Sequence, residues 1–430
     1  MLTAEENELL TRVEGNTPMA QTMRSHWIPA LLSEEVAEPD GKPVRVRLLG
    51  QNLVVFRDSK GRLGALDELC PHRRASLVYG RNEDCGLRCL YHGWKFDVSG
   101  NCVDMSSEPP ESTLKEKVKH KAYAVNECGG FVWIYLGDSQ TMPAFERPAF
   151  SPDDATPVSI VKIRVAANWA QIMEGQIDSA HSSSLHSSDM VPARVSSAGA
   201  DSERWLRPST DKSPRMVAET TDYGFRYAAL RRPIKDASTH DYVRITVYIA
   251  PFIALIPPNS SYNVASVIVP EDDHHSAFYF IAWGGNECPD TSAWRDFCRA
   301  VPGEDLNEDY TSRRHLGNDF LQDRELMKEG NYTGVPGIPN QDIIMWTSMG
   351  SIVDRSSELL GASDLAIVEF RRLMVGAARA KSVGQPAIGT SERKSVYTDI
   401  ASFQGIVEKA RDWRSLGIDQ QSQPDFKQAD

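Results

Sequence analysis

Two short segments of the sequence each carry one cysteine and one histidine. One residue separates Cys70 from His72, two separate Cys89 from His92, and sixteen lie between His72 and Cys89. Thiolates and imidazoles both bind transition metals strongly, so four such side chains form a complete ligand set. A proline in the first segment and a glycine in the second indicate turns, which favours ligands presented from loops. The pattern predicts a metal centre held between two loops.

Two kinds of metal centre use two cysteines and two histidines. In a Rieske [2Fe–2S] cluster, one iron takes both thiolates and the other takes both imidazoles. A structural zinc ion also accepts this set, but zinc sites usually pair like with like, as in Cys-x-x-Cys. Because each segment here carries one residue of each kind, the spacing favours the Rieske cluster. Its imidazole ligands raise the reduction potential, which suits the cluster to pass single electrons to an oxidising acceptor.

A second group of metal-binding side chains follows in the pattern Asp178-x-x-His181-x4-His186. Asp178 and His181 would share one face of the helix expected from Asn168 onward. His181 and His186 lie about 140° apart around an ideal helix, so they reach one metal only if the helix distorts between them. The serines at 182–184 favour such a distortion, because serine side chains compete for backbone hydrogen bonds.

Two histidines and one carboxylate would leave open positions on Fe(II) for oxygen and substrate. Asp178 is poorly placed for the third position, so the carboxylate must come from elsewhere in the chain. Taken alone, two histidines in a serine-rich helix are more readily interpreted as surface or hydrogen-bonded residues. The electron-transfer cluster predicted upstream needs an acceptor, and this favours the iron site.

Taken together, the two motifs resemble the Rieske non-haem iron ring-hydroxylating oxygenases, in particular their terminal oxygenase component. The similarity covers essentially the whole chain. It is most specific for the phthalate 4,5-dioxygenase branch of that family, in the segments 71–77, 91–97 and 175–181. The resemblance implies a [2Fe–2S] cluster on Cys70, His72, Cys89 and His92, and a mononuclear Fe(II) on His181 and His186.

The resemblance also implies a third iron ligand, an aspartate near the start of a late helix. Asp342 matches that position, although an aspartate there would also serve as a helix N-cap. Asp354 and Asp364 are the alternatives. The family further implies a homotrimer, with stacking to a hexamer left open, in which the cluster of one subunit faces the iron of its neighbour. Asp178 would take a catalytic role there by bridging a cluster histidine and His181.

The same resemblance implies the reaction and the partners. The expected reaction is cis-dihydroxylation of phthalate at carbons 4 and 5, with O₂ and with electrons from NADH. These would arrive through a separate reductase carrying flavin and an iron–sulfur centre, because this chain has no glycine-rich nucleotide fingerprint after a strand. The alternatives are a monooxygenase or demethylase, and a dioxygenase for 3-chlorobenzoate, phenoxybenzoate or isophthalate. The non-enzymatic alternatives are a Rieske electron carrier and an interaction protein stabilised by a structural zinc ion.

An aromatic dicarboxylate calls for arginines, whose forked guanidinium groups match carboxylates. Arg244 is the first candidate, because alternation along 242–248 places it on a polar and aromatic face, directed either to a cavity or to solvent. Arg207 is the second candidate, and Ser179 would add a hydroxyl donor. The alternatives are three further arginines: Arg226, Arg231 and Arg232.

Composition limits the class of protein. The chain has 430 residues, 41% hydrophobic and 25% charged, which predicts a globular protein of two or three domains. Its formal net charge of −12 disfavours a nucleic-acid partner. The acidic N-terminus is unlike a secretory signal, and no apolar run is long enough for a membrane span. The scattered cysteines are expected to be free thiols, and we expect a cytoplasmic protein.

The predicted fold is α+β, in three parts. Residues 1–25 form an N-terminal helix and loop, residues 26–140 a small antiparallel β domain with the cluster, and residues 141–430 the catalytic domain. A proline-rich stretch from 142 to 157 marks the last boundary. The catalytic domain is expected to be a helix-grip fold, an antiparallel sheet covered by helices, with a helical C-terminal extension. Helices are expected at 291–299, 308–328, 341–355 and 363–382.

Overall fold

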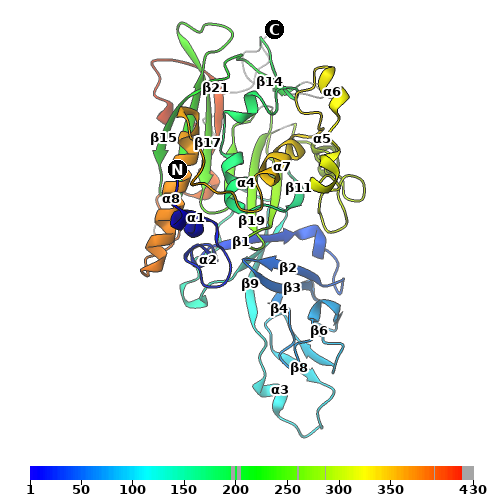
Figure 1. Ribbon diagram of the computed structural model, residues 1–430. Coiled ribbons are helices and arrows are strands. Elements are labelled where there is room, and N and C mark those ends of the chain that lie inside the picture. Colours follow the sequence, from blue (N-terminus) through cyan, green and yellow to red (C-terminus); the bar gives the residue numbers. More distant parts are fainter. Residues whose placement is uncertain (195–198, 201–204, 259–260, 286, 392, 419–430) are drawn as a thin grey trace. The chain divides into compact units, whose positions relative to one another are not determined.

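The computed structural model describes residues 1–194, 199–200, 205–258, 261–285, 287–391 and 393–418 (Figure 1). The chain divides into two compact units. The smaller comprises Val13–Asn16 and Met23–Phe145, and the larger comprises Met1–Arg12, Thr17–Thr22 and Glu146–Asp430. The end of the expected C-terminal extension, residues 419–430, lies outside the described residues.

The smaller unit is built almost entirely from antiparallel strands. Its first sheet has the order β1-β10-β9-β4-β3-β2 and its second the order β5-β6-β7-β8. The first sheet contains β1 (Trp27–Leu32), β2 (Val44–Leu48), β3 (Gln51–Arg57), β4 (Leu63–Asp67), β9 (Ala122–Cys128) and β10 (Phe131–Tyr135). The second contains β5 (Arg81–Glu83), β6 (Gly86–Arg88), β7 (Trp94–Phe96) and β8 (Cys102–Met105), and a short helix α3 (Leu114–Lys117) follows it.

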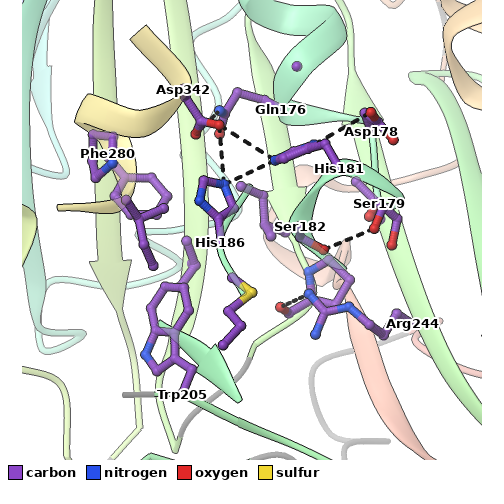
Figure 2. Close-up of a pocket in the computed structure, with 18 of the residues that line it drawn as sticks. Gln176, Asp178, Ser179, His181, Ser182, His186, Trp205, Arg244, Phe280 and Asp342 are labelled. Carbon is purple, nitrogen blue, oxygen red and sulfur yellow. Dashed lines mark hydrogen bonds and ion pairs between the residues drawn. The ribbon is translucent and has the colours of Figure 1, made fainter. Parts of the chain in front are cut away.

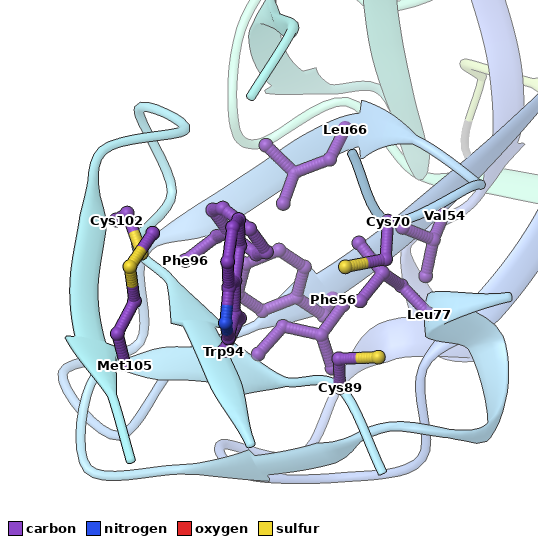
Figure 3. Close-up of a cluster of buried hydrophobic side chains, with 11 residues drawn as sticks. Val54, Phe56, Leu66, Cys70, Leu77, Cys89, Trp94, Phe96, Cys102 and Met105 are labelled. Atoms are coloured by element: carbon purple, nitrogen blue, oxygen red, sulfur yellow. The ribbon is translucent and has the colours of Figure 1, made fainter. Parts of the chain in front are cut away.

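The two sheets of this unit enclose an apolar cluster. Alternation along β7 turns Trp94 and Phe96 to the same side, where they meet residues of β3 and β4. Cys70 and Cys89 belong to the same cluster, which also contains Val54, Phe56, Leu66, Leu77, Leu87, Cys102 and Met105. Figure 3 shows Cys70 and Cys89 together on one side of Trp94, with Cys102 on the other.

One large antiparallel sheet forms the centre of the larger unit. Its order is β11-β20-β19-β18-β17-β16-β15, and β21 pairs with β17 beside that path. Its strands are β11 (Val158–Val165), β15 (Arg215–Thr220), β16 (Gly224–Arg231), β17 (His240–Ile249), β18 (Ile253–Ile256), β19 (Asn263–Pro270), β20 (Ser276–Trp283) and β21 (Phe403–Glu408). A second, small sheet has the order β12-β14-β13, formed by β12 (Met190–Pro192), β13 (Gly199–Ala200) and β14 (Trp205–Arg207).

Helices pack on this large sheet. Besides α3, the described residues form the helices α1 (Ala4–Thr11), α2 (Pro18–Arg24), α4 (Trp169–Gln176), α5 (Thr291–Cys298), α6 (Arg324–Lys328), α7 (Ile338–Ser348) and α8 (Leu365–Ser382). Helix α4 packs on β18 and β19, α5 on β11, and α8 on β15 and β16. Figure 1 shows α8, in orange, running along the strands at that edge. The predicted α+β class is therefore confirmed. None of the helices in the described residues is long and apolar enough to cross a membrane.

Some predicted helix bounds are wrong. The segment 308–328 is not one helix, because it contains only a 3-10 turn, Leu316–Leu321, and the short α6. Asp319 and Phe320 both have positive φ there, which a right-handed helix does not allow. Helix α7 begins before residue 341, since Gly337 caps it with φ 84° and a proline fits its first turn. It ends at Ser348, well before 355.

The packing of α4 on α7 positions the candidate site. Gly175 faces the indole of Trp346, and a Cβ at this glycine would overlap the indole nitrogen. Gln171 of α4 donates to the carbonyl oxygens of Trp346 and Gly350, both at 2.8 Å. The close approach of the two helices brings the end of α4 beside the second turn of α7.

A buried ionic network fixes the other face of α4. Glu174 accepts from Arg355 at 2.9 Å and from Arg371 of α8 at 2.7 Å. Burial alone would raise the pKa of Glu174, but the two guanidinium groups outweigh burial and lower it. Arg355 also donates to Asn7 of α1 at 3.0 Å, so the network ties together three helices and the segment after α7.

Candidate metal centres and substrate pocket

The chain turns sharply after α4, and this turn carries the candidate ligands. Helix α4 ends at Gln176, and the Oδ1 atom of Asp178 accepts from the backbone N–H of Ala180 at 2.7 Å. A 3-10 turn follows at His181–Ser183. His181 and His186 therefore lie on consecutive turns and not on one distorted helix, so the predicted continuation of the helix through both is wrong.

His181, His186 and Asp342 converge on one point (Figure 2). The Nε2 atoms of the two histidines are 3.1 Å apart, and Asp342 Oδ1 lies 3.5 Å from His181 Nε2 and 3.2 Å from His186 Nε2. Two imidazoles and one carboxylate facing each other in this way match the facial ligand set of non-haem Fe(II). The donor set and its convergence fit a mononuclear iron.

Asp342 lies in the second turn of α7 and is 4% exposed. It is not the N-cap, since that position belongs to Gly337. The two alternative aspartates lie outside the triad, and each accepts hydrogen bonds within its own local turn. Asp354 is exposed and accepts from Ser356, and Asp364 accepts from the N–H of Gly361.

Each of the three converging side chains contacts a further polar group through its outer atom. His181 Nδ1 lies 3.6 Å from Asp178 Oδ2, His186 Nδ1 lies 2.7 Å from Gln341 Oε1, and Gln176 Nε2 lies 3.4 Å from Asp342 Oδ2. Burial alone would raise the pKa of Asp178, but His181 outweighs burial and lowers it. Burial would lower the pKa of His181, but Asp178 and Asp342 raise it.

The two Cys–His segments of the smaller unit form matching loops. In each loop the carbonyl oxygen of the cysteine accepts from the N–H four residues later, at 2.9 Å for Cys70 and 3.0 Å for Cys89. Gly93 closes the second loop with φ 74°, and a Cβ there would overlap the hydroxyl of Ser106. A side chain here would have to displace the Ser106 hydroxyl, so glycine is the favoured residue at this position.

The side chains of these loops are arranged as a thiol pair and an imidazole pair. Both cysteines are buried, and burial raises the pKa of the Cys70 thiol to about 11. The rings of His72 and His92 have centroids 4.4 Å apart, and His72 stacks on Trp94 at 4.4 Å. His92 Nδ1 is buried and makes no hydrogen bond within the described residues, so its lone pair is open to a metal. These features fit a Rieske cluster.

Comparison with known proteins agrees with both sites. The model of the Rieske [2Fe-2S] domain matches residues 26–122, and that of the LigXa C-terminal domain like family matches residues 134–429. The chain is 61% identical to the phthalate 4,5-dioxygenase oxygenase subunit of Pseudomonas putida, over 96% of this chain and 94% of that protein. The chain belongs to the Rieske oxygenases. Members of this family carry a Rieske [2Fe–2S] cluster and a mononuclear iron at the catalytic site.

Two further proteins are similar to this Rieske oxygenase, one in sequence and one in fold. It is 36% identical to the 3-chlorobenzoate-3,4-dioxygenase oxygenase subunit of Comamonas testosteroni, over 96% of this chain and 98% of that protein. Among solved structures, the QL mutant of Pseudomonas putida CBB5 NdmA with caffeine shares the fold, with a TM-score of 0.61. That match has 18% sequence identity and covers 92% of this chain and 99% of the other.

In this Rieske oxygenase a pocket opens beside the converging triad. Asp178, Ser179 and Arg244 line its polar side, and Thr246 extends that side along β17. The apolar side is formed mainly by Trp205, Ile256, Val264, Phe278 and Phe280. An apolar wall with few polar groups suits a flat aromatic molecule that carries a charged substituent.

Three buried arginines gather next to this pocket. Arg207, Arg231 and Arg244 are 4%, 1% and 3% exposed. Arg244 donates to the Tyr242 hydroxyl at 3.2 Å and to the Pro257 carbonyl oxygen at 3.1 Å. Because Arg244 lines the pocket, its face of β17 is directed to a cavity and not to solvent.

The other two of these arginines are held by serines. Arg207 lies behind the lining and donates to Ser182 Oγ at 3.0 Å, and Arg231 donates to the Ser179 carbonyl oxygen at 2.7 Å. Burial and the charges of neighbouring arginines lower the pKa of Arg207 to about 9 and that of Arg231 to about 10. No carboxylate among the described residues forms an ion pair with either one.

The remaining predicted arginines lie away from the pocket. Arg226 pairs with Glu219 and donates to backbone carbonyl oxygens near the C-terminus, and Arg232 is exposed beside Asp211. Sequence reasoning missed Gln176 and Gln341. Neither residue has a spacing signal, because Gln176 meets Asp342 across the α4–α7 contact and Gln341 meets His186 on the turn after α4.

Proposed function

We propose that this chain is the oxygenase subunit that cis-dihydroxylates phthalate at carbons 4 and 5. The observation that carries the proposal is the group of three buried arginines beside the His181–His186–Asp342 triad. Arg207 and Arg231 form no ion pair with a carboxylate among the described residues, and such buried cations favour an anionic ligand, because an anion offsets the desolvation of each guanidinium. The similarity to a phthalate 4,5-dioxygenase supports the choice of this dicarboxylate.

In this proposal, His181, His186 and Asp342 hold the mononuclear iron, and Cys70, His72, Cys89 and His92 hold the cluster. When bound, the cluster supplies single electrons and the iron activates oxygen next to the substrate ring. Asp178 fixes His181 through its outer nitrogen, and so orients the inner nitrogen toward the shared point.

The pocket residues bind and orient the substrate. Arg244 pairs with one carboxylate of phthalate, and the hydroxyl of Ser179 donates to it. Arg207 adds positive charge from behind Ser182 and stabilises the second carboxylate. The ring packs against Trp205 and Phe280, which excludes water and presents its far edge to the triad.

The relatives are named oxygenase subunits, which supports a separate electron donor. We infer an NADH-dependent reductase with flavin and an iron–sulfur centre, and O₂ as cosubstrate. We also infer a homotrimer in which Asp178 bridges to a cluster histidine of the neighbouring subunit. Residues 26–140 and 141–430 are the proposed cluster and catalytic domains. None of the seven cysteines forms a disulfide, which supports a reducing, cytoplasmic location.

A second candidate is a benzoate with one carboxylate, favoured by the 36% identity to a 3-chlorobenzoate dioxygenase subunit. Binding measured across phthalate, isophthalate, benzoate and 3-chlorobenzoate separates these substrates. Phthalate should bind most tightly, and equal binding of benzoate would reject the dicarboxylate site. Turnover with labelled O₂ then tests the reaction. Both labelled atoms should enter one diol, whereas a single labelled atom would assign the chain to the monooxygenases or demethylases.

A further inference from the structure

Gln341 is a buried carboxamide placed between the candidate ligands and the turn that follows them. It is 1% exposed and directly precedes Asp342 on α7. Its Oε1 atom lies 2.7 Å from His186 Nδ1, and its Nε2 atom donates to Asp189 Oδ2 at 2.8 Å and to the Val335 carbonyl oxygen at 3.0 Å. All three of these contacts are within normal hydrogen-bond length.

These contacts determine which way the amide points. Asp189 and the Val335 carbonyl can only accept, so the group that faces both of them must be the NH₂ of Gln341. The oxygen of the amide therefore faces His186, and an amide oxygen only accepts. It follows that His186 carries its proton on Nδ1 and keeps the lone pair of Nε2 for the shared point of the triad.

The two histidines are backed by different groups. His181 has the carboxylate of Asp178 behind it, whereas His186 has the neutral amide of Gln341. The contact between Gln341 and His186, at 2.7 Å, is also shorter than the contact between Asp178 and His181, at 3.6 Å. Gln341 additionally joins α7, which carries Asp342, to the turn that carries His186.

We propose that Gln341 is a positioning residue that sets the tautomer and orientation of His186, and that Asp189 keeps the Gln341 amide from reversing. This inference rests on the proposed metal role of His186. A carboxamide here supplies the required acceptor without adding a second negative charge beside Asp342. Loss of such an outer partner typically lowers metal affinity by about 10- to 100-fold.

The test measures the Fe(II) dissociation constant of the holoenzyme by competition with a chelator, with cluster absorbance as a check on integrity. Gln341→Met removes the acceptor at nearly constant volume, and should weaken Fe(II) binding by about 10- to 100-fold. The matched control is Gln322→Met. Gln322 is partly buried and donates to the Thr333 carbonyl oxygen at 2.7 Å, outside the α4–α7 contact and the triad. This control should keep the wild-type dissociation constant.

A paired substitution tests the orientation directly. In Gln341→Glu with Asp189→Asn, a carboxylate oxygen still accepts from His186 and the amide at position 189 becomes the donor, while the Val335 carbonyl oxygen loses its donor. The double variant should recover part of the affinity that Gln341→Met loses. If Gln341→Met does not fold, Asp189→Leu replaces it, because Asp189 is only partly buried. That variant leaves the amide one acceptor, the Val335 carbonyl oxygen, instead of two, so the amide is held less firmly and binding should weaken several-fold.

The outcomes separate the two proposals. Equal affinity in Gln341→Met and Gln322→Met, or no effect of Asp189→Leu, overturns the positioning role alone. Unchanged Fe(II) binding in His186→Ala instead overturns the metal site on which the proposed function depends.

Discussion

Gly175 of α4 lies against the indole of Trp346 on α7, with no room for a side chain between them. The contact sets the separation of the two helices from which Gln176 and Asp342 project. Gly175→Ala should therefore lower the free energy of unfolding by about 1–3 kcal/mol, the usual cost of overpacking. It should also reduce the mononuclear iron content, measured by metal analysis beside thermal unfolding.

The sign of this effect is informative, because alanine is the better helix former by about 1 kcal/mol. Gly376 of α8 is the matched control, since a Cβ there meets no atom within 4 Å. Gly376→Ala should raise the unfolding temperature and leave the iron content unchanged. A stabilising effect of Gly175→Ala would show that the helices move apart at no cost.

The buried network around Glu174 predicts a large loss of stability. Glu174→Gln leaves Arg355 and Arg371 without their shared carboxylate, at a cost of about 3–5 kcal/mol in the free energy of unfolding. The pKa of Glu174 in the folded chain lies below its usual 4.5. Its contribution is therefore present above that pH and is lost as the pH falls through the folded pKa. Denaturant unfolding should show the gap between wild type and variant closing in acid.

Asp342→Ala tests the third ligand. The variant should lose the mononuclear iron and all turnover, because two imidazoles alone hold Fe(II) weakly, and should keep the cluster absorbance. Iron analysis together with the visible spectrum gives both readings. Asp354→Ala is the control, since that side chain is exposed and outside the triad. If iron is retained in Asp342→Ala but lost in Asp354→Ala, the third ligand is Asp354 and not Asp342.

Arg244→Ala should weaken phthalate binding by about 2–5 kcal/mol, the range for truncating one partner of a buried charge pair. Arg207→Ala should also weaken it, by less, because Arg207 lies behind the lining. Binding measured by calorimetry should be unaffected in Arg232→Ala, whose side chain is exposed. Wild-type affinity in Arg244→Ala would remove the arginine from the substrate site.

Asp178→Asn keeps the size of the side chain but removes the charge that faces His181. Both metal centres should remain loaded, and the cluster should still be reduced by its reductase. Turnover should fall steeply, because in the proposed trimer Asp178 is the carboxylate that bridges the cluster and the iron. Steady-state product formation and the rate of cluster reoxidation measure this, and normal reoxidation would refute the bridge.

Local features of this protein could be read from its sequence because short spacing encodes them. The cluster motif places its cysteines and histidines in two turns, and a turn is determined by a few neighbouring residues such as Gly93. The antiparallel sheets expected in the sequence rest on apolar patterns and turn residues, which also depend only on close neighbours. The α+β class was confirmed for the same reason.

Long-range relationships were decided by the tertiary structure. Gln341 meets His186 across a separation of 155 residues, and nothing in either local sequence marks the pair. The turn after α4 replaced the predicted helix, and positive φ values broke the helix predicted at 308–328, because tertiary contacts override local preference. The sequence determined which side chains could bind metal and substrate. Only the packing of α4 against α7 decided which of them meet, because that distance depends on shape complementarity between segments far apart in the chain.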